Sequence, residues 1–167
     1  KTGMSPSREV SFTPGELKIR FQPETAKIPA GFLADTGKPY GDRGNGFTYG
    51  WSADCTKQAR QRAEGYGGTF CHFNKNQKWE IAIPNGRYEV TVGVGDVPYA
   101  SDNTINVEGV EFCKHHRLNK DTAEFTKTVV VADGRLTVDS GDSQDMQTKM
   151  THVTFVDAGQ DAKPSSP

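Results

Sequence analysis

Aromatic and planar polar side chains gather in three segments of the chain that have no regular period. The first segment runs from Asp35 to Trp51 and the second from Gly95 to Asn103; in the third, Gln58 to Arg62, two arginines would project on one side of an extended chain. An aromatic ring can cover the apolar C–H face of a sugar, while carboxylate, amide and guanidinium groups bond adjacent hydroxyls. These residue types therefore predict a surface for a flat, hydroxylated ligand.

The candidate ligand-binding residues come from the first two segments. They are Asp35, Tyr40, Arg43, Tyr49, Asp96, Tyr99 and Asp102. Several have a structural alternative: Asp35 and Asp96 could instead cap turns or hold Arg43. Phe47 and Trp51 are better explained as core residues that seal the long first segment. Arg43 could form a fork-like contact with a carboxylate of the protein or of an acidic sugar.

No residue pattern typical of a catalytic site is present in the sequence. It contains no Gly-x-Ser-x-Gly elbow, HExxH motif, P-loop or dinucleotide fingerprint. His72 and His152 fall on expected strands, where a packed imidazole is the default, and nothing indicates partners for His115 and His116. A carboxylate pair for glycoside hydrolysis depends on a distance in space, which the sequence leaves open. We therefore predict a non-catalytic protein without a cofactor.

Length and charge narrow the possible partners. The chain has 167 residues, enough for one domain with a real core, and its 20 basic and 21 acidic residues give a formal net charge of -1. No basic excess favours nucleic acid or an anionic membrane. No apolar run approaches the roughly 20 residues that span a bilayer. We expect no nucleic-acid partner and no membrane span.

The three cysteines, Cys55, Cys71 and Cys113, bear on the redox compartment. None has the spacing of a structural zinc site. One disulfide plus one free thiol fits an extracellular protein, whereas three reduced thiols fit a cytosolic one. We favour the first interpretation, with Cys55–Cys71 or Cys71–Cys113 as the pair.

Alternation of apolar and polar residues predicts strands along most of the chain. Trp79, Ile81 and Ile83 alternate with Glu80 and Ala82, for example. Further strands are expected at 17–21, 88–94, 104–107, 110–113, 125–131, 136–139 and 150–156. Short strands separated by turns rich in Gly, Asn and Asp indicate an all-β fold, an antiparallel β-sandwich or jelly roll.

Turn residues and composition set the expected boundaries. Pro84-Asn85-Gly86 ends one strand, and Asp133-Gly134 is expected to join two strands as a tight hairpin. Thr56 to Glu64 is the one segment that could form a helix, but it has too few apolar residues to bury a face. We predict an N-terminal extension at 1–16, a single β-sandwich domain at 17–157, and a flexible tail or linker at 158–167.

The order of several motifs resembles a known family. They are FQP, PAGFLADTG, YGDRGNGFTYGW, WEIAIPNGRYEVTVGVGD, INVEGV, VVVADGRLTV and KMTHVTFVD, in that order. This order is similar to the galactose-binding-like jelly-roll domains of the malectin and carbohydrate-binding-module kind. The resemblance covers roughly residues 17–157. Such domains are commonly appended to secreted polysaccharide-active enzymes and to extracellular multidomain proteins, so it implies a secreted or extracellular protein.

The resemblance also implies where a ligand would lie. In these domains the loop after the first strand and the loop after the YEVTV-type strand meet at one edge of the sandwich. Tyr40, Tyr49 and Tyr99 look like positions where relatives carry ligand-contacting aromatics. Relatives often hold a structural calcium near the first and last strands. The nearby oxygens here belong to Glu16, Gln22 and Asp157, the second of which is neutral.

Two features depart from the family pattern and keep a second function open. The stretch CKHHRLN, from Cys113 to Asn119, is more basic than the usual turn at that place, and the cysteines are not part of the pattern. The first hypothesis is a non-catalytic module that binds a polysaccharide or other glycan at the sandwich edge. The alternative is an extracellular structural or assembly protein that uses the same fold to bind a protein partner, such as a larger parent protein.

Overall fold

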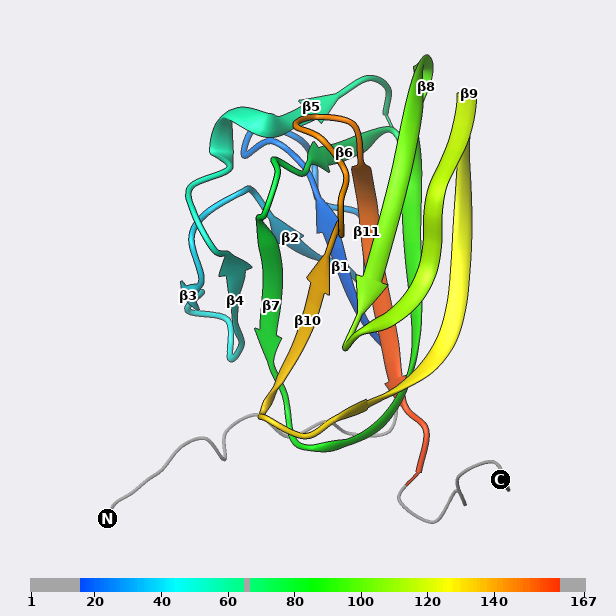
Figure 1. Cartoon of the computed structure of the whole chain (residues 1–167). Helices are drawn as coiled ribbons and strands as arrows, with labels where there is room; N and C mark the ends of the chain where they lie inside the picture. Colours follow the sequence, from blue (N-terminus) through cyan, green and yellow to red (C-terminus); the bar gives the residue numbers. More distant parts are fainter. Residues whose placement is uncertain (1–15, 65–66, 160–167) are drawn as a thin grey trace.

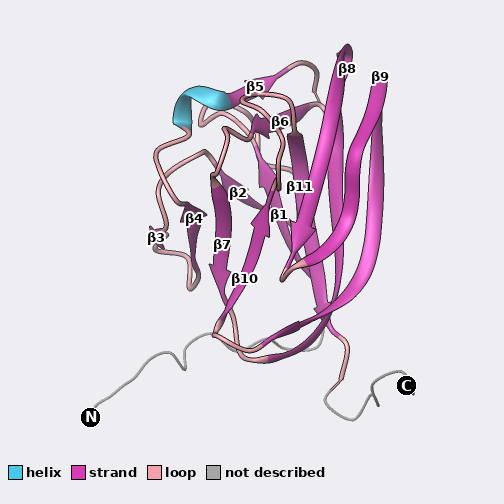
Figure 2. Cartoon of the chain, viewed as in Figure 1, coloured by secondary structure: helices cyan, strands magenta, loops and turns pink. Residues whose placement is uncertain are grey.

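The computed structural model describes residues 16–64 and 67–159, and almost all of their regular structure is β-strand (Figure 2). The strands are β1 (Leu17–Phe21), β2 (Leu33–Asp35), β3 (Gly41–Asp42), β4 (Thr48–Trp51), β5 (Ala59–Gln61), β6 (Thr69–His72), β7 (Lys78–Ala82), β8 (Gly86–Val107), β9 (Val110–Val131), β10 (Arg135–Asp139) and β11 (Lys149–Asp157). A 3-10 turn, η2 (Thr56–Gln58), precedes β5. The two expected terminal extensions, 1–16 and 158–167, lie almost wholly outside the described residues.

Two layers share one long hairpin. The first half of β8 pairs with β11, and its last residues pair with β10, so the same strand belongs to both layers. β9 follows β8 along nearly its whole length. Figure 1 shows this β8–β9 ribbon folding over along the side of the molecule away from β3 and β4. One layer contains β2, β1, β11, β8 and β9; the other contains β9, β8, β10, β7, β4 and β3. The predicted β-sandwich of jelly-roll type is confirmed.

The bend in the β8–β9 ribbon has a local cause. Pairing is regular up to Asp96↔Asp121 and resumes at Ala100↔Asn119, so β8 has three residues opposite one residue of β9. Gly95 and Lys120 both have positive φ, +124° and +59°, and a Cβ on Gly95 would collide with the backbone oxygen of Asp121. Bulges of this kind let a strand turn from one sheet into the other. The resulting corner carries the second of the three candidate binding segments.

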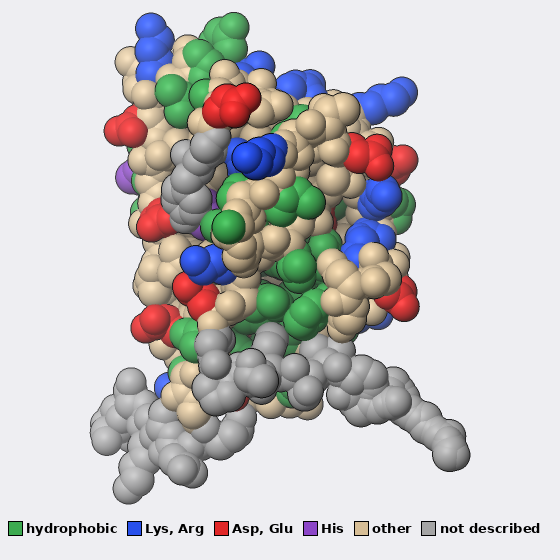
Figure 3. Space-filling model, turned by 180° about the vertical axis from the view of Figure 1, so that it is seen from behind, with side chains coloured by type: hydrophobic (Ala, Val, Ile, Leu, Met, Phe, Trp, Pro, Cys, Tyr) green, Lys and Arg blue, Asp and Glu red, His purple; other side chains and the backbone are tan. Residues whose placement is uncertain are grey.

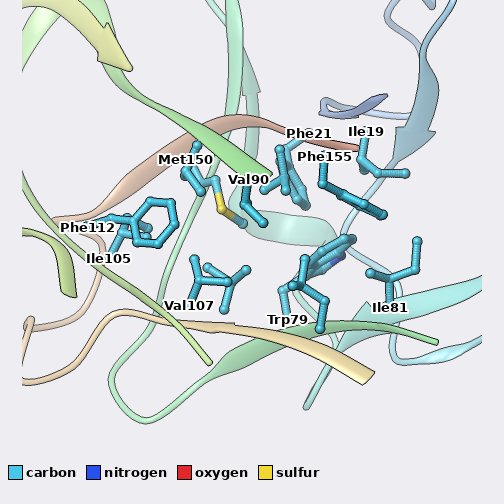
Figure 4. Close-up of a cluster of buried hydrophobic side chains, with 14 of the residues drawn as sticks. Ile19, Phe21, Trp79, Ile81, Val90, Ile105, Val107, Phe112, Met150 and Phe155 are labelled. Atoms are coloured by element: carbon cyan, nitrogen blue, oxygen red, sulfur yellow. The ribbon is translucent and has the colours of Figure 1, made fainter. Parts of the chain in front are cut away.

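The core lies between the two layers and follows the alternation in the sequence. Trp79 and Ile81 are fully buried, whereas Glu80 between them points outward and pairs with Arg135. Figure 4 shows side chains from both layers meeting in this core. Phe21 packs edge-on against Trp79, with ring centroids 5.3 Å apart. Burial of these large side chains supplies the main driving force for joining the layers.

Two local expectations are wrong. The Asp133-Gly134 turn does not form a hairpin, because β9 pairs with β8 while β10 pairs with β7 and β8. Its glycine N–H donates to the side chain of Asn85, which joins two turns at the same end of the sandwich. The expected all-antiparallel pairing also has an exception, since β1 and β2 run parallel. Residues 56–64 were expected to have little tendency to form a helix, and they contain one 3-10 turn followed by β5.

The expected disulfide is also wrong, because Cys55, Cys71 and Cys113 are free, buried thiols. Each sulfur lies near a backbone oxygen: Cys55 Sγ is 3.4 Å from that of Ala53, Cys71 Sγ 3.8 Å from that of Cys55, and Cys113 Sγ 3.5 Å from that of Asn103. Burial raises the pKa of Cys55 to about 12 and that of Cys113 to about 11, and it raises the pKa of Cys71 as well.

These thiols are therefore expected to react very slowly in the native protein. At about pH 8 the thiolate, which is the reactive form, is scarce because each pKa lies far above that pH, and burial blocks the reagent. Titration with an aromatic disulfide reagent should detect almost no thiol in the folded chain, and three per chain at once in denaturant without reductant. Fewer than three in denaturant would reveal a disulfide and contradict the structure.

Candidate functional site

Asp35, the first candidate, is a buried structural carboxylate. Its Oδ1 accepts hydrogen bonds from Trp51 Nε1 at 2.9 Å and from the backbone N–H of Gly37 at 2.8 Å. Its Oδ2 accepts from Trp79 Nε1 at 2.8 Å. Burial raises the pKa of Asp35, and the three N–H donors oppose that rise. With 1% of its surface exposed, this carboxylate joins β2 to the indoles of β4 and β7.

Arg43 and Tyr49 also have structural roles. Tyr49 is buried, and its hydroxyl donates to the oxygen of Ala34 at 2.8 Å. Arg43 lies over the Tyr49 ring, 5.4 Å from its centroid, and its Nη2 donates to the backbone oxygens of Lys38 and Pro39. Gly50 permits this arrangement, because a Cβ there would lie 2.5 Å from Arg43 Nη2. The arginine thus fixes the hairpin of β3 and β4.

The first segment leaves a small cavity beside these residues. It has a volume of about 270 Å³, and its lining includes Arg43, Asn45 and Tyr49 from this segment and Phe32 from the preceding loop. Tyr40 is not part of it; its ring stacks on the guanidinium of Arg135, 4.0 Å away. Of the candidates in the first segment, Arg43 and Tyr49 line this cavity, whereas Asp35 and Tyr40 do not.

Asp96, in the second segment, anchors a cluster of five side chains. We use the name Asp96 cluster for Arg62, Phe70, Asp96, Tyr99 and Lys149. The Asp96 carboxylate is fully buried and accepts from Lys149 Nζ at 2.7 Å and from Arg62 Nε at 3.3 Å. Arg62 in turn lies over two rings, 4.9 Å from the centroid of Tyr99 and 5.3 Å from that of Phe70. Tyr99 itself remains 57% exposed.

A groove lies next to the Asp96 cluster, and we call it the tip groove. Its volume is about 530 Å³. It is lined by residues of β8, β9, β11 and the 140–148 loop: Ala100, Ser101, Asp102, Arg117, Leu118, Asn119, Met146, Gln147 and Lys149. Asp102 thus lines the groove directly, while Asp96 lies behind it through Lys149, and Tyr99 directly precedes the lining residue Ala100. The groove combines apolar surface with carboxylate, amide, hydroxyl and cationic groups.

The structure separates the two segments that the family resemblance brings together. The tip groove and the smaller cavity share no lining residue. In Figure 1, β3 and β4 lie on one side of the molecule and the β8–β9 ribbon lies on the other. Of the seven candidates, Asp102 lines the tip groove, Asp96 and Tyr99 belong to the adjacent Asp96 cluster, and the other four lie elsewhere.

Several groove residues were missed from the sequence. Lys149 reads as an ordinary strand residue, and its pairing with Asp96 joins positions 53 residues apart. Met146 and Gln147 lie in a polar loop without a distinctive pattern. Arg117 and Asn119 could have been recognised from the sequence, since both belong to the unusually basic stretch CKHHRLN. That departure from the family pattern is where β9 contributes to the groove wall.

The three calcium candidates do not share one site. β1 and β11 are antiparallel, with Leu17↔Phe155 and Arg20↔His152, so Glu16 and Asp157 lie at one end of the pair and Gln22 at the other. Gln22 is also engaged, because its amide donates to Ala26 and accepts from Arg20. Among the residues of 16–64 and 67–159, no group of three or more His, Cys, Asp or Glu side chains is placed to hold a metal ion.

The surface is mixed in charge. Figure 3 shows basic and acidic side chains scattered over the back of the molecule, without a large area of one sign. Within the part of the chain that the structure describes, there is no helix with the length and apolar character needed to cross a membrane.

No family model matches the chain, and no curated protein matches it by sequence. Solved structures do match. The Bacillus subtilis protein YXIM aligns with a TM-score of 0.62 and 21% identity over 87% of this chain and 41% of that chain. A β-glucuronidase of Bacteroides uniformis aligns with a TM-score of 0.57 and 10% identity over 86% of this chain and 18% of the enzyme.

A third match is a complex of the plant peptide RALF23 with FER and LLG2. It aligns with a TM-score of 0.55 and 10% identity over 93% of this chain and 43% of the matched chain. The chain therefore spans less than half of each of these three neighbours. At these identities the likeness is one of fold, and it agrees with the β-sandwich of jelly-roll type described above.

Proposed function

We propose that this chain is a non-catalytic carbohydrate-binding module that holds a glycan in the tip groove. The observation that carries the proposal is the groove itself, an open hollow of about 530 Å³ beside an exposed tyrosine. Small-molecule sites usually have volumes of roughly 300–1,000 Å³ and combine apolar surface with a few placed polar groups. Leu118 and Met146 supply the apolar part here, and Asp102, Asn119 and Gln147 supply hydrogen-bonding groups.

The ring of Tyr99 is held in an orientation that would let a sugar ring stack on it. The guanidinium of Arg62 lies against it, and the Asp96 carboxylate holds that guanidinium in place. A ring with a fixed orientation loses little conformational freedom when a ligand stacks on it, so more of the contact energy appears as affinity. The exposed surface of Tyr99 would meet the C–H face of a sugar while the groove's amides bond its hydroxyls.

The neighbours in fold support a modular setting. The Bacteroides uniformis match is a β-glucuronidase of which this fold makes up only a part, and the Bacillus match is also much longer than this chain. By analogy, this chain would act beside other domains of a secreted or extracellular protein. The rival proposal, an assembly protein, drew on the basic stretch and a free thiol. Cys113 is buried, and Arg117 and Asn119 belong to the groove wall.

Binding to immobilised glycans tests the proposal directly. We expect the folded chain to bind at least one glycan class, and Tyr99→Ala to weaken that binding roughly tenfold, since loss of a stacked ring costs about 1.5 kcal/mol. Asn119→Ala should weaken it as well, through lost hydroxyl contacts. Isothermal titration calorimetry would give the affinities.

Tyr40→Ala is the matched control, because that ring stacks on Arg135 away from the groove. It should leave glycan affinity unchanged. If the correctly folded chain bound no glycan on a broad glycan array, the proposal would be excluded. Equal binding by Tyr99→Ala, Asn119→Ala and the unaltered chain would exclude the tip groove as the site.

A further inference from the structure

One imidazole lies between two carboxylates at the wall of the tip groove. His115 of β9 has its Nδ1 3.5 Å from Asp102 Oδ1 and its Nε2 3.0 Å from Asp142 Oδ1. Asp102 lines the groove from β8, and Asp142 belongs to the 140–148 loop, which also supplies the lining residues Met146 and Gln147. The histidine thus lies between a groove residue of β8 and the loop.

The two contacts together need two N–H donors. A neutral imidazole has one N–H and one lone pair, so in either tautomer one carboxylate faces a lone pair, whereas the imidazolium donates from both nitrogens. Asp102 Oδ1 is buried and has no hydrogen-bond partner among the described residues, although His115 Nδ1 is its neighbour. A proton on Nδ1 would supply the missing donor and remove the cost of a buried, unsatisfied acceptor.

The backbone also holds His115 in an uncommon conformation. Its φ is +47°, in the left-handed region that residues with a Cβ rarely adopt. It lies opposite a register shift in β8 between Asn103 and Ile105. Its N–H donates to Thr104 Oγ1 at 2.9 Å, which fixes this conformation. The ring is therefore aimed between the two carboxylates by the chain itself.

We propose that His115 is a positioning residue of the tip groove, and that its imidazolium form fastens the 140–148 loop to β8 and so strengthens ligand binding at low pH. The inference rests on the proposed glycan site.

Other charges near the ring are Arg117, whose Nε is 3.8 Å from Asp102 Oδ2, and Lys114 and Glu111, which line a small cavity with Asp142. Asp102 and Asp142 are the two acidic groups within 4 Å of the ring nitrogens in the described part of the chain.

Amide hydrogen exchange tests the positioning without any ligand. The N–H of Asp102 donates to the oxygen of Gln147, so its protection reports on the attachment of the loop to β8. After correction for intrinsic rates, protection at Asp102 should be lower at about pH 8, where an imidazole is mostly neutral, than at about pH 5.5. In His115→Gln, and separately in Asp142→Asn, this pH dependence should disappear. The matched control is His116→Gln, whose ring stacks on Phe125 instead, and it should keep the profile of the unaltered chain.

Glycan affinity, measured over the same range, is the second readout. We expect the dissociation constant of the unaltered chain to rise at least threefold toward about pH 8, and that of His115→Gln to stay flat. A pH profile of exchange that is unchanged in His115→Gln, or a flat profile in the unaltered chain, would overturn the inference. If exchange behaves as expected but no glycan binds at any pH, the positioning role of His115 stands and the proposed function fails.

Discussion

Replacing Asp35 by alanine is expected to lower the free energy of unfolding by about 4 kcal/mol. The change leaves three buried N–H donors without an acceptor, two of them tryptophan indoles, at about 1–3 kcal/mol each before relaxation. Trp51 and Trp79 are among the largest buried side chains of the core, so the loss loosens the packing between β2, β4 and β7. Urea denaturation followed by tryptophan fluorescence would measure the effect.

Asp35→Asn is expected to be almost as damaging as the alanine variant. Its amide nitrogen would bring a donor against an indole or backbone N–H that already donates. Asp42→Ala is the matched control: this exposed carboxylate accepts only a turn N–H, from Gly44, and its loss should cost less than about 1 kcal/mol. If Asp35→Ala were as mild as the control, Asp35 would not be the structural anchor that its contacts indicate.

Asp96→Ala is expected to cost about 3–5 kcal/mol of stability and to weaken glycan binding. Removing one partner of a buried ion pair leaves the other charge uncompensated. Here Lys149 Nζ would keep only the oxygen of Ala100, and Arg62 would lose the carboxylate that holds it against Tyr99. Calorimetric unfolding would measure the first effect and titration with a bound glycan the second.

A double variant separates the charge from the packing. Exchanging a buried ion pair for apolar groups of similar size is often close to neutral, so Asp96→Ala with Lys149→Met should recover much of the lost stability. Glycan affinity should not recover with it, because Arg62 still lacks its anchor. A double variant as unstable as Asp96→Ala would show that the cost arises from packing rather than from an unpaired ammonium.

The strands were largely predictable because each needs only local information. Alternation at Trp79 and Ile81 reflects a surface with one buried face, and the side-chain period of a strand is two wherever it occurs. The bend in the β8–β9 ribbon was not predictable in the same way. The sequence predicts separate strands at 88–94 and 104–107, with a polar loop between them. The pairing with β9 on both sides of this segment shows that they belong to one strand, β8.

The site was predictable in part for a related reason. Tyr99 is exposed and Asp102 lines the tip groove, so their residue types were informative. Asp35 has the same chemistry, but its partners are indoles 16 and 44 residues away, which local sequence does not connect. Lys149 was missed because a lysine in a strand usually lies in solvent. Here the side chain is buried and forms an ion pair with Asp96, which is far away in the sequence.

The ribbon shared by both layers also links the register of one sheet to that of the other. A slip of one residue in either half of β8 would turn its buried side chains outward, and the continuous chain would carry the slip around the corner into the second layer. The tip groove takes its ribbon residues from beyond this corner and Lys149 from β11 of the first layer. A partly folded chain with only one layer formed therefore has no groove, so capacity to bind would appear only with the complete sandwich.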